Sequence, residues 1–297
     1  MEIREVGVLG CGLMGSGIAQ VSAASGYPTV VLEANQELCD RGLSNIVKRL
    51  ERLVQKKALS AADKSALEAR LTVTTDKSKL SNCDIVVEAI IENLDEKNKL
   101  WRSLDPILKR DAILASNTSS VSITAMMVAT SRVDRFLGVH FMNPVPMMEL
   151  VEVIQTVATA PDVYEASINW VKKLGKQPVR TSDRPGFIVN RLLIPYLLDS
   201  IRGLEEGIGS VEDIDKSMRL GCGHPMGPFI LLDFIGLDTT YYIANILFDE
   251  FKEPRFAPPG LLKRLVIAGW HGRKTGKGFY DYSDPNSPKV LDHLKRC

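Results

Sequence analysis

The chain has few cysteines, and their arrangement argues against a disulfide-stabilised fold. It holds five among 297 residues, and none of them forms a C-x-x-C pair. An odd number of scattered cysteines is a poor basis for a disulfide framework. We therefore expect reduced thiols in a reducing compartment, at Cys11, Cys39, Cys83, Cys222 and Cys297.

The sequence also lacks a charge excess and a long hydrophobic run. Its 37 basic and 36 acidic side chains leave a net charge of +1, so bulk charge gives no indication of nucleic-acid binding. No apolar run reaches the roughly 18 residues that a membrane span needs. A buried-strand pattern begins at residue 3, almost at Met1, so we expect no signal or transit peptide before the fold. These features predict a cytoplasmic protein without a nucleic-acid or membrane partner.

The first half of the chain alternates short β-branched runs with longer helical patterns. This alternation predicts an α/β domain whose mostly parallel sheet is wrapped by helices. The expected strands are 6–9, 29–32, 71–74, 85–88, 112–115, 136–139, 149–154 and 177–180, and the expected helices are 14–25, 36–57, 61–69, 95–108, 122–129 and 161–174.

The helical stretches 36–57 and 61–69 predict a helical hairpin inserted between two strands. The first of them is strongly basic, with Lys48, Arg49, Arg52, Lys56 and Lys57. Such a charged run is usually a solvated face, but it also suits an anionic ligand such as a nucleotide phosphate. The residues alone leave both interpretations open.

The alternation stops at the turn 183–186, and helical spacing of apolar residues then continues to about Phe251. The length favours two domains over one. We therefore predict a first domain over 1–184 and an all-helical second domain over 185–297.

Three glycines directly after the first strand form G-x-G-x-x-G at the opening of a helix: Gly10, Gly12 and Gly15. The first allows a tight turn, the second lets a pyrophosphate approach the backbone, and the third lets the helix pack on the strand. In this context the motif predicts a Rossmann-type dinucleotide site, in which Leu13 and Met14 also contact the cofactor, rather than a glycine turn without a ligand.

Glu33 ends the second strand about 20 residues further on, where an acidic side chain can accept hydrogen bonds from the adenine ribose hydroxyls. Its charge would repel the 2′-phosphate of NADP. The sequence thus predicts NAD as the cofactor, and it indicates no metal site.

Four polar segments follow the sheet strands or open the second domain: 116–120, 140–144, 149–152 and 186–191. Ligands of open α/β sheets bind at the carboxyl ends of strands. Among the four histidines, His140 alone follows a Rossmann strand; His224, His271 and His293 do not.

Alcohol oxidation by hydride transfer needs a base for the hydroxyl proton, and an imidazole suits this task near neutral pH. Glu152 could fix the tautomer of His140 and stabilise its charged form. The plainer alternative for His140 is a packed histidine at a strand end, and for Glu152 it is a charge at a sheet edge. A buried carboxylate must be paired, however, which favours the functional interpretation.

Several long motifs resemble one family over nearly the whole chain. They are VGVLGCGLMGSGIAQ, VVEAIIENLDEK, ASNTSS, GVHFMNPVPMMELVEV, PGFIVNRLL, the PMGPF stretch, GLDTT and GRKTGKGFYDY. The sequence resembles the L-3-hydroxyacyl-CoA dehydrogenases, a family that includes the bacterial 3-hydroxybutyryl-CoA dehydrogenases.

This resemblance implies roles for individual residues. His140 would be the catalytic base and Glu152 its partner, while Ser119 and Asn190 would hydrogen-bond the reacting oxygen. Ser119 would lie between cofactor and substrate, and the other residues implied for the NAD site are Glu92, Lys97, Asn143 and Lys274.

The resemblance also implies an acyl-CoA substrate, contacted by the basic helix around 48–57, and a homodimer formed through the helical domain, with 187–204 and 228–235 in the interface. One departure is Glu33, because the family usually has Asp there. Two rival functions remain: a dehydrogenase of free hydroxy acids, such as a gulonate dehydrogenase, and a recruited structural protein of the lambda-crystallin kind. The basic insertion and the long C-terminal motifs favour the acyl-CoA branch.

Overall fold

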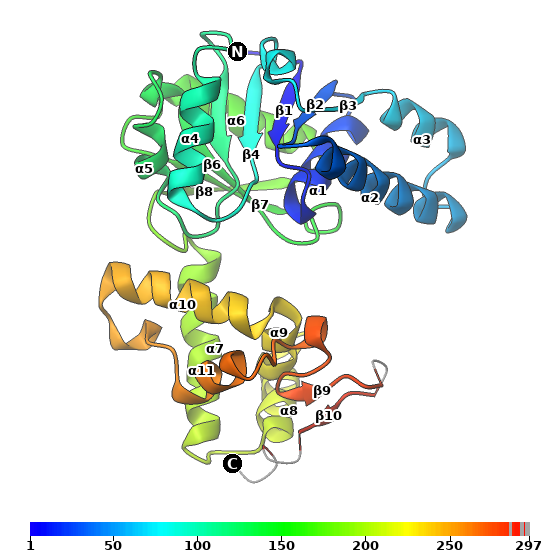
Figure 1. Ribbon diagram of the computed structural model, residues 1–297. Helices are drawn as coiled ribbons and strands as arrows, with labels where there is room; N and C mark the ends of the chain where they lie inside the picture. Colours follow the sequence, from blue (N-terminus) through cyan, green and yellow to red (C-terminus); the bar gives the residue numbers. More distant parts are fainter. Residues whose placement is uncertain (285–286, 292–293, 295–297) are drawn as a thin grey trace. The chain divides into compact units, whose positions relative to one another are not determined.

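A computed structural model describes residues 1–284, 287–291 and 294 (Figure 1). The chain divides into two compact units, Met1–Phe187 and Ile188–Cys297. The four cysteines Cys11, Cys39, Cys83 and Cys222 are free thiols. Cys297 and His293 lie outside the described residues.

The first unit is built on one eight-stranded sheet with the order β3-β2-β1-β4-β5-β6-β7-β8. Neighbouring strands are parallel except for β6 and β7, which run antiparallel, so the predicted mostly parallel sheet is confirmed. The strands are β1 Val6–Leu9, β2 Thr29–Leu32, β3 Leu71–Thr74, β4 Ile85–Glu88, β5 Ile113–Ser116, β6 Phe136–Phe141, β7 Leu150–Gln155 and β8 Gln177–Ser182.

Alternate residues of the central strands pack into two different apolar clusters, because side chains of a strand point to opposite faces. Val87 joins the cluster that contains Ile18 of α1 and Ile46 of α2, whereas its neighbour Val86 joins the cluster of Trp101 in α4. Helices therefore cover both faces, as in a doubly wound domain. Their bounds are α1 Leu13–Ala24, α2 Gln36–Gln55, α3 Ala61–Glu68, α4 Leu94–Leu104, α5 Ile123–Met127 and α6 Pro161–Lys173, with short 3₁₀ turns η1 Lys77–Leu80 and η2 Val133–Arg135.

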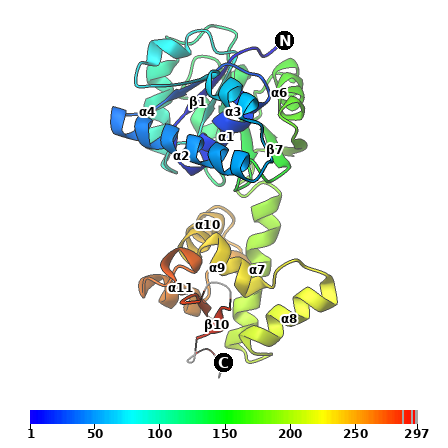
Figure 2. The ribbon, with the colours of Figure 1, turned by 90° about the vertical axis from the view of Figure 1, so that its right-hand side faces the viewer.

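Helices α2 and α3 form the predicted helical hairpin, which extends past the β3 edge of the sheet (Figure 1) and lies beside α1 (Figure 2). Each begins with a side-chain cap: Asn35 accepts from the N–H of Leu38, and Ser60 accepts from the N–H of Asp63. Only one face of the long α2 is buried, which matches its mixed apolar and charged sequence.

The second unit is helical, as predicted, around its own apolar cluster. Its helices are α7 Val189–Glu205, α8 Val211–Cys222, α9 Pro228–Ile235, α10 Leu237–Phe251 and α11 Gly260–Ile267, with 3₁₀ turns η3 Pro254–Phe256 and η4 Arg273–Thr275. Two short antiparallel strands, β9 Tyr280–Asp281 and β10 Lys289–Val290, are added beyond Phe251, where the helical pattern ends. The "all-helical" prediction is therefore correct in its main part and misses this small pair.

Two buried aspartates anchor the C-terminal segment of the second unit. Asp215 accepts from the N–H groups at the start of α9 and from the hydroxyl of Tyr280. Asp233 accepts from the N–H groups of Phe279 and Tyr280 and from the hydroxyl of Tyr282. Residues Phe279 to Tyr282, which include β9, are thus fixed by hydrogen bonds to two carboxyl groups in the core.

Within the described part of the chain, no single helix is long and apolar enough to cross a membrane; α9 and α10 meet the length and composition test only as a pair bent by 93°.

Candidate functional site

The glycine turn between β1 and α1 has the geometry that a dinucleotide needs. Gly10 has a φ of +93°, and a Cβ added at Gly15 would lie 1.9 Å from the carbonyl oxygen of Gly10. A Cβ at Gly12 would meet nothing within 4 Å, so the backbone is open there. Gly12 is the N-cap of α1 and supplies no side-chain cap, and the first turn has no acidic residue. The first N–H groups of α1 therefore suit a pyrophosphate, and the residues present fit NAD.

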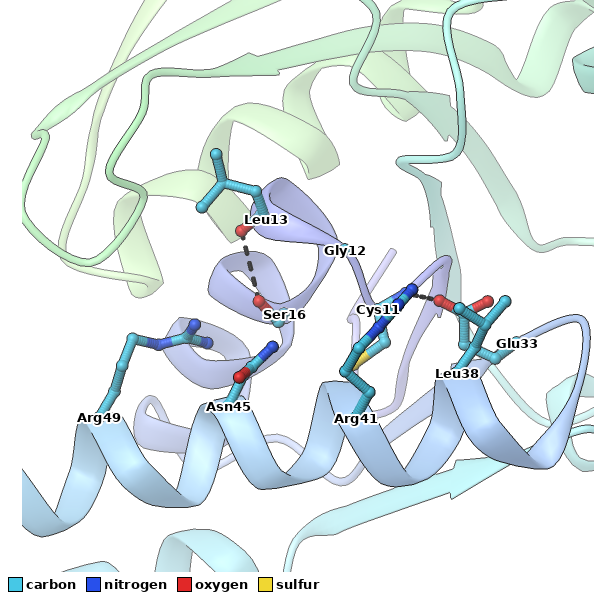
Figure 3. Close-up of a pocket in the computed structure, with 9 residues that line it drawn as sticks. All are labelled: Cys11, Gly12, Leu13, Ser16, Glu33, Leu38, Arg41, Asn45 and Arg49. Carbon is cyan, nitrogen blue, oxygen red and sulfur yellow. Dashed lines mark hydrogen bonds between the residues drawn. The ribbon is translucent and has the colours of Figure 1, made fainter. Parts of the chain in front are cut away.

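Glu33, directly after β2, turns its carboxylate toward this glycine turn (Figure 3). One carboxylate oxygen accepts from the N–H of Cys11, and the other accepts from the N–H of Ala34 at 3.1 Å. Burial, together with the charge of Glu33, raises the pKa of the Cys11 thiol to about 11. The carboxylate is thus held in place while Cys11 stays a neutral thiol.

A cavity of about 280 Å³ lies between the glycine turn and α2. Figure 3 shows Leu38, Arg41, Asn45 and Arg49 in a row along α2, and the opposite wall consists of Cys11, Gly12, Leu13, Ser16 and Glu33. Of the six basic residues of α2 and its end, Arg41 and Arg49 line this cavity, while Lys48, Arg52, Lys56 and Lys57 are exposed and do not line it. The basic face is therefore mainly solvated, with two guanidinium groups beside the cofactor turn, of which that of Arg49 is half-buried.

His140 and Glu152 are cross-strand partners in the antiparallel pair β6 and β7. Their side chains meet with Nδ1 of His140 at 2.7 Å from Oε2 of Glu152, and both are buried. Glu152 lies on an inner strand and is paired, so it is not a sheet-edge charge. A carboxylate at Nδ1 favours the tautomer that carries its proton there, which leaves Nε2 as a proton acceptor. The pair can therefore act as a base and carry the positive charge that results.

The carboxylate of Glu92 accepts several hydrogen bonds from the loop that follows β5. Its Oε1 accepts from the N–H of Ser119 at 3.0 Å and from the hydroxyls of Thr118 and Ser120, and its Oε2 lies 3.1 Å from Nζ of Lys97. Burial opposes ionisation of Glu92, but Lys97 and these hydrogen bonds outweigh it, so the pKa lies below its usual range. Three predicted site residues, Glu92, Lys97 and Ser119, thus form one connected network.

Sequence reasoning missed Glu88, the fully buried last residue of β4. It accepts from Nζ of Lys97 at 2.6 Å, from the hydroxyl of Ser116 at 2.6 Å and from the N–H of Ile90 at 2.7 Å. A carboxylate at the end of a buried strand with a lysine nine residues later was the signal that could have found it. Glu88 joins the ends of β4 and β5 beneath the Ser119 loop.

The remaining predicted residues occupy different parts of the chain. Asn143 is exposed in the loop between β6 and β7. Asn190 is the second residue of α7, and Lys274 pairs with Asp238 at 2.6 Å. The last two belong to the second unit, and their roles toward cofactor and substrate stay predictions. The described residues contain no group of three or more side chains suited to a metal ion.

The sequence matches two family models, the 3-hydroxyacyl-CoA dehydrogenase NAD binding domain over residues 5–184 and the 3-hydroxyacyl-CoA dehydrogenase C-terminal domain over residues 186–282. The 3-hydroxybutyryl-CoA dehydrogenase of Bradyrhizobium diazoefficiens is 45% identical over 94% of this chain and 96% of its own. The human mitochondrial hydroxyacyl-coenzyme A dehydrogenase is 45% identical over 94% of this chain and 91% of its own.

A solved structure gives the same result. FadB2 of Mycobacterium tuberculosis superposes with a TM-score of 0.93 at 46% identity, and the match covers 95% of this chain and 100% of that one. The dinucleotide turn, the paired histidine and carboxylate, and these matches over both units lead to one conclusion: the chain belongs to the 3-hydroxyacyl-CoA dehydrogenase family of NAD-dependent oxidoreductases.

Proposed function

We propose that this protein catalyses the reversible NAD-dependent oxidation of an (S)-3-hydroxyacyl-CoA to the 3-oxoacyl-CoA, with a short-chain substrate such as 3-hydroxybutyryl-CoA. The observation that carries the proposal is the buried contact of 2.7 Å between Nδ1 of His140 and Oε2 of Glu152, on a unit that also presents an open glycine turn. Proton removal and hydride acceptance are the two requirements of alcohol oxidation.

In the oxidation direction, Nε2 of His140 takes the proton of the 3-hydroxyl group, and Glu152 stabilises the imidazolium at Nδ1. The cofactor, when bound, accepts the hydride from C3. In the reverse direction the imidazolium returns the proton to the forming alkoxide. Phe187, whose ring centroid lies 5.7 Å from that of His140, helps to keep water from the imidazole.

The reacting oxygen also needs donors that face it before the reaction begins. We assign this task to the hydroxyl of Ser119 and the side-chain amide of Asn190. The Glu92 carboxylate accepts from the N–H of Ser119 and so fixes the backbone that carries this hydroxyl. A preorganised donor of this kind is typically worth about 3 kcal/mol in the transition state.

The two units divide the work in this proposal. The first, over 1–184, binds NAD through Gly10, Gly12, Leu13, Met14, Gly15 and Glu33, together with Glu92, Lys97, Ser119 and Asn143. The second, over 185–297, contributes Lys274 to the cofactor and Asn190 to the substrate and forms the homodimer. The basic end of α2 meets the coenzyme A moiety, and the enzyme works in the cytoplasm.

The test measures the consumption of NADH by the purified protein, once with acetoacetyl-CoA and once with free acetoacetate. A third assay measures the consumption of NADPH with acetoacetyl-CoA. Rapid NADH oxidation with the thioester alone is the expected result. Turnover of the free acid instead would move the protein to the hydroxy-acid dehydrogenases. No turnover with either substrate, despite NADH binding, would favour the recruited structural protein.

A further inference from the structure

A buried ammonium group lies beneath the loop that joins β6 to β7. Lys176, the residue before β8, is only 7% exposed. Its Nζ donates to the carbonyl oxygens of Val145 at 2.7 Å, Met148 at 2.8 Å and Pro146 at 3.4 Å. All three acceptors belong to one short stretch of backbone, so a single cation organises the loop.

The arrangement is unusual for a lysine, because its hydrogen bonds go to backbone dipoles instead of a carboxylate. Burial lowers the pKa of Lys176, and the charge of the exposed Glu149 acts in the opposite direction. An ammonium inside a protein is costly unless it is well solvated by polar groups. Three converging carbonyl oxygens provide that solvation, and each of them would lose its donor if the ammonium were removed.

The same loop connects the two halves of the proposed active site. It begins directly after the strand of His140, carries Asn143 and leads into the strand of Glu152. Its Val145 is buried against α1, since a Cβ added at Gly17 would lie 2.7 Å from Cβ of Val145. The loop thus touches the helix that begins at the glycine turn.

We infer that Lys176 is a positioning residue, whose ammonium fixes the backbone of residues 145–148 and thereby sets the His140–Glu152 pair relative to the cofactor helix α1. The inference rests on the proposed function for its effect on turnover. Its effect on NADH binding depends on NAD binding, which the family match shows, and not on the proposed reaction.

The experiment compares wild-type protein with Lys176→Met, which keeps most of the side-chain volume, and Lys176→Ala, which leaves space. Lys172→Ala, an exposed lysine of α6, is the matched control. The measured quantities are kcat/KM for NADH with acetoacetyl-CoA, NADH affinity by fluorescence titration, and folding by circular dichroism. A small displacement of reacting groups is costly, so we expect kcat/KM to fall roughly 10- to 100-fold in both variants. NADH binding should weaken as well, and Lys172→Ala should resemble wild type.

Chemical rescue separates positioning from a merely structural role. Propylammonium replaces the atoms that Lys176→Ala removes and can donate to the three carbonyl oxygens, whereas tetramethylammonium has the same charge but no N–H group. We expect propylammonium to restore NADH binding and turnover of Lys176→Ala, and tetramethylammonium at equal ionic strength to restore neither.

The inference is overturned if Lys176→Met stays within about twofold of wild type in both quantities, or if propylammonium fails to restore a folded Lys176→Ala protein. Wild-type protein that binds NADH but does not reduce acetoacetyl-CoA would refute the proposed function alone, because NADH affinity and its rescue would still test Lys176.

Discussion

At the scale of single residues, the site depends on a register. Antiparallel pairing places His140 opposite Glu152, and both lie on the same face because cross-strand partners share a face. A shift of one residue would turn one of the two side chains to the other face of the sheet. The contact therefore follows from strand pairing and needs no special loop.

We expect His140→Gln to lower turnover by roughly 10²-fold to 10⁴-fold, because it removes the base but leaves the glycine turn intact. Glu152→Gln should also lower turnover, since it removes the charge that stabilises the imidazolium. The double variant should be no slower than His140→Gln alone, because Glu152 acts through His140. Steady-state kinetics of the three variants with acetoacetyl-CoA, with NADH affinity as the control, check this. Near wild-type turnover in His140→Gln would remove the base assignment.

Glu33 supports a second prediction at this scale. Its carboxylate lines one cavity together with Arg41 and Arg49, whose charges attract a phosphate. Glu33→Gln keeps these guanidinium groups and removes the repulsion of a 2′-phosphate. We expect the preference for NADH over NADPH to shrink at least tenfold, measured as the ratio of kcat/KM values. Arg41→Ala is the complementary variant and should keep the preference for NADH; an unchanged ratio in Glu33→Gln would contradict the role of its charge.

At the scale of elements, the two buried aspartates of the second unit make its stability depend on pH. Burial raises the pKa of Asp233 to about 6, against hydrogen bonds from the backbone of Phe279 and Tyr280 that lower it. The ordinary value for the unfolded chain is 3.8. Folding therefore favours the protonated form of Asp233. The resulting contribution to the free energy of unfolding is fully present below pH 3.8 and is lost as the pH rises through about 6.

Wild-type protein should consequently gain about 1 kcal/mol of unfolding free energy relative to Asp233→Asn when the pH falls from about 7.5 to about 5. Urea unfolding at both pH values, followed by circular dichroism, measures the difference. Asp249→Asn, at an exposed position of α10, is the matched control. A difference between wild type and Asp233→Asn that is the same at both pH values would show that Asp233 does not titrate in this range.

The elements of the first unit could be predicted because their patterns are local. The runs at β1, β2, β3 and β4 are short, β-branched and bounded by turns, and their predicted bounds agree with the structure. His140 was expected just after a strand, whereas β6 continues through Phe141 because its pairing with β7 extends that far. Strand length is decided by the partner strand, which the local pattern does not contain.

The contacts of the site were less accessible to sequence reasoning. Periodicity places Glu88 and Lys176 as ordinary strand-end and loop residues. Their roles arise from contacts with segments 9 to 31 positions away, including the backbone carbonyl oxygens of one loop. Every residue type has a backbone carbonyl oxygen, so the sequence does not show which of them accept a hydrogen bond from a side chain. Such groups are found only once the chain is folded.

At the scale of the whole molecule, the proposed homodimer can be tested at exposed apolar side chains of the second unit. The two segments expected in the dimer interface, 187–204 and 228–235, expose Leu192 and Phe234 with relative accessibilities of 69% and 46%. Isolated exposed apolar residues are common and need no partner, so these side chains serve as the positions at which the proposed interface is tested. The chain has a mass of 32.8 kDa, so a dimer is readily distinguished by light scattering.

We expect wild-type protein to run as a dimer and Leu192→Glu or Phe234→Glu to shift it toward the monomer, because each places a charge in an apolar contact. Ile267→Glu is the matched control: Ile267 is 75% exposed on α11, outside both segments, and its substitution should leave the dimer intact. NADH affinity should be unchanged in Leu192→Glu and Ile267→Glu, since neither side chain is assigned to the cofactor. Phe234→Glu is compared by oligomeric state alone, because the Phe234 ring lies 5.4 Å from the guanidinium of Arg273, the neighbour of Lys274. A monomeric wild-type protein would refute the dimer. Equal loss of the dimer in Ile267→Glu would contradict the location assigned to the interface.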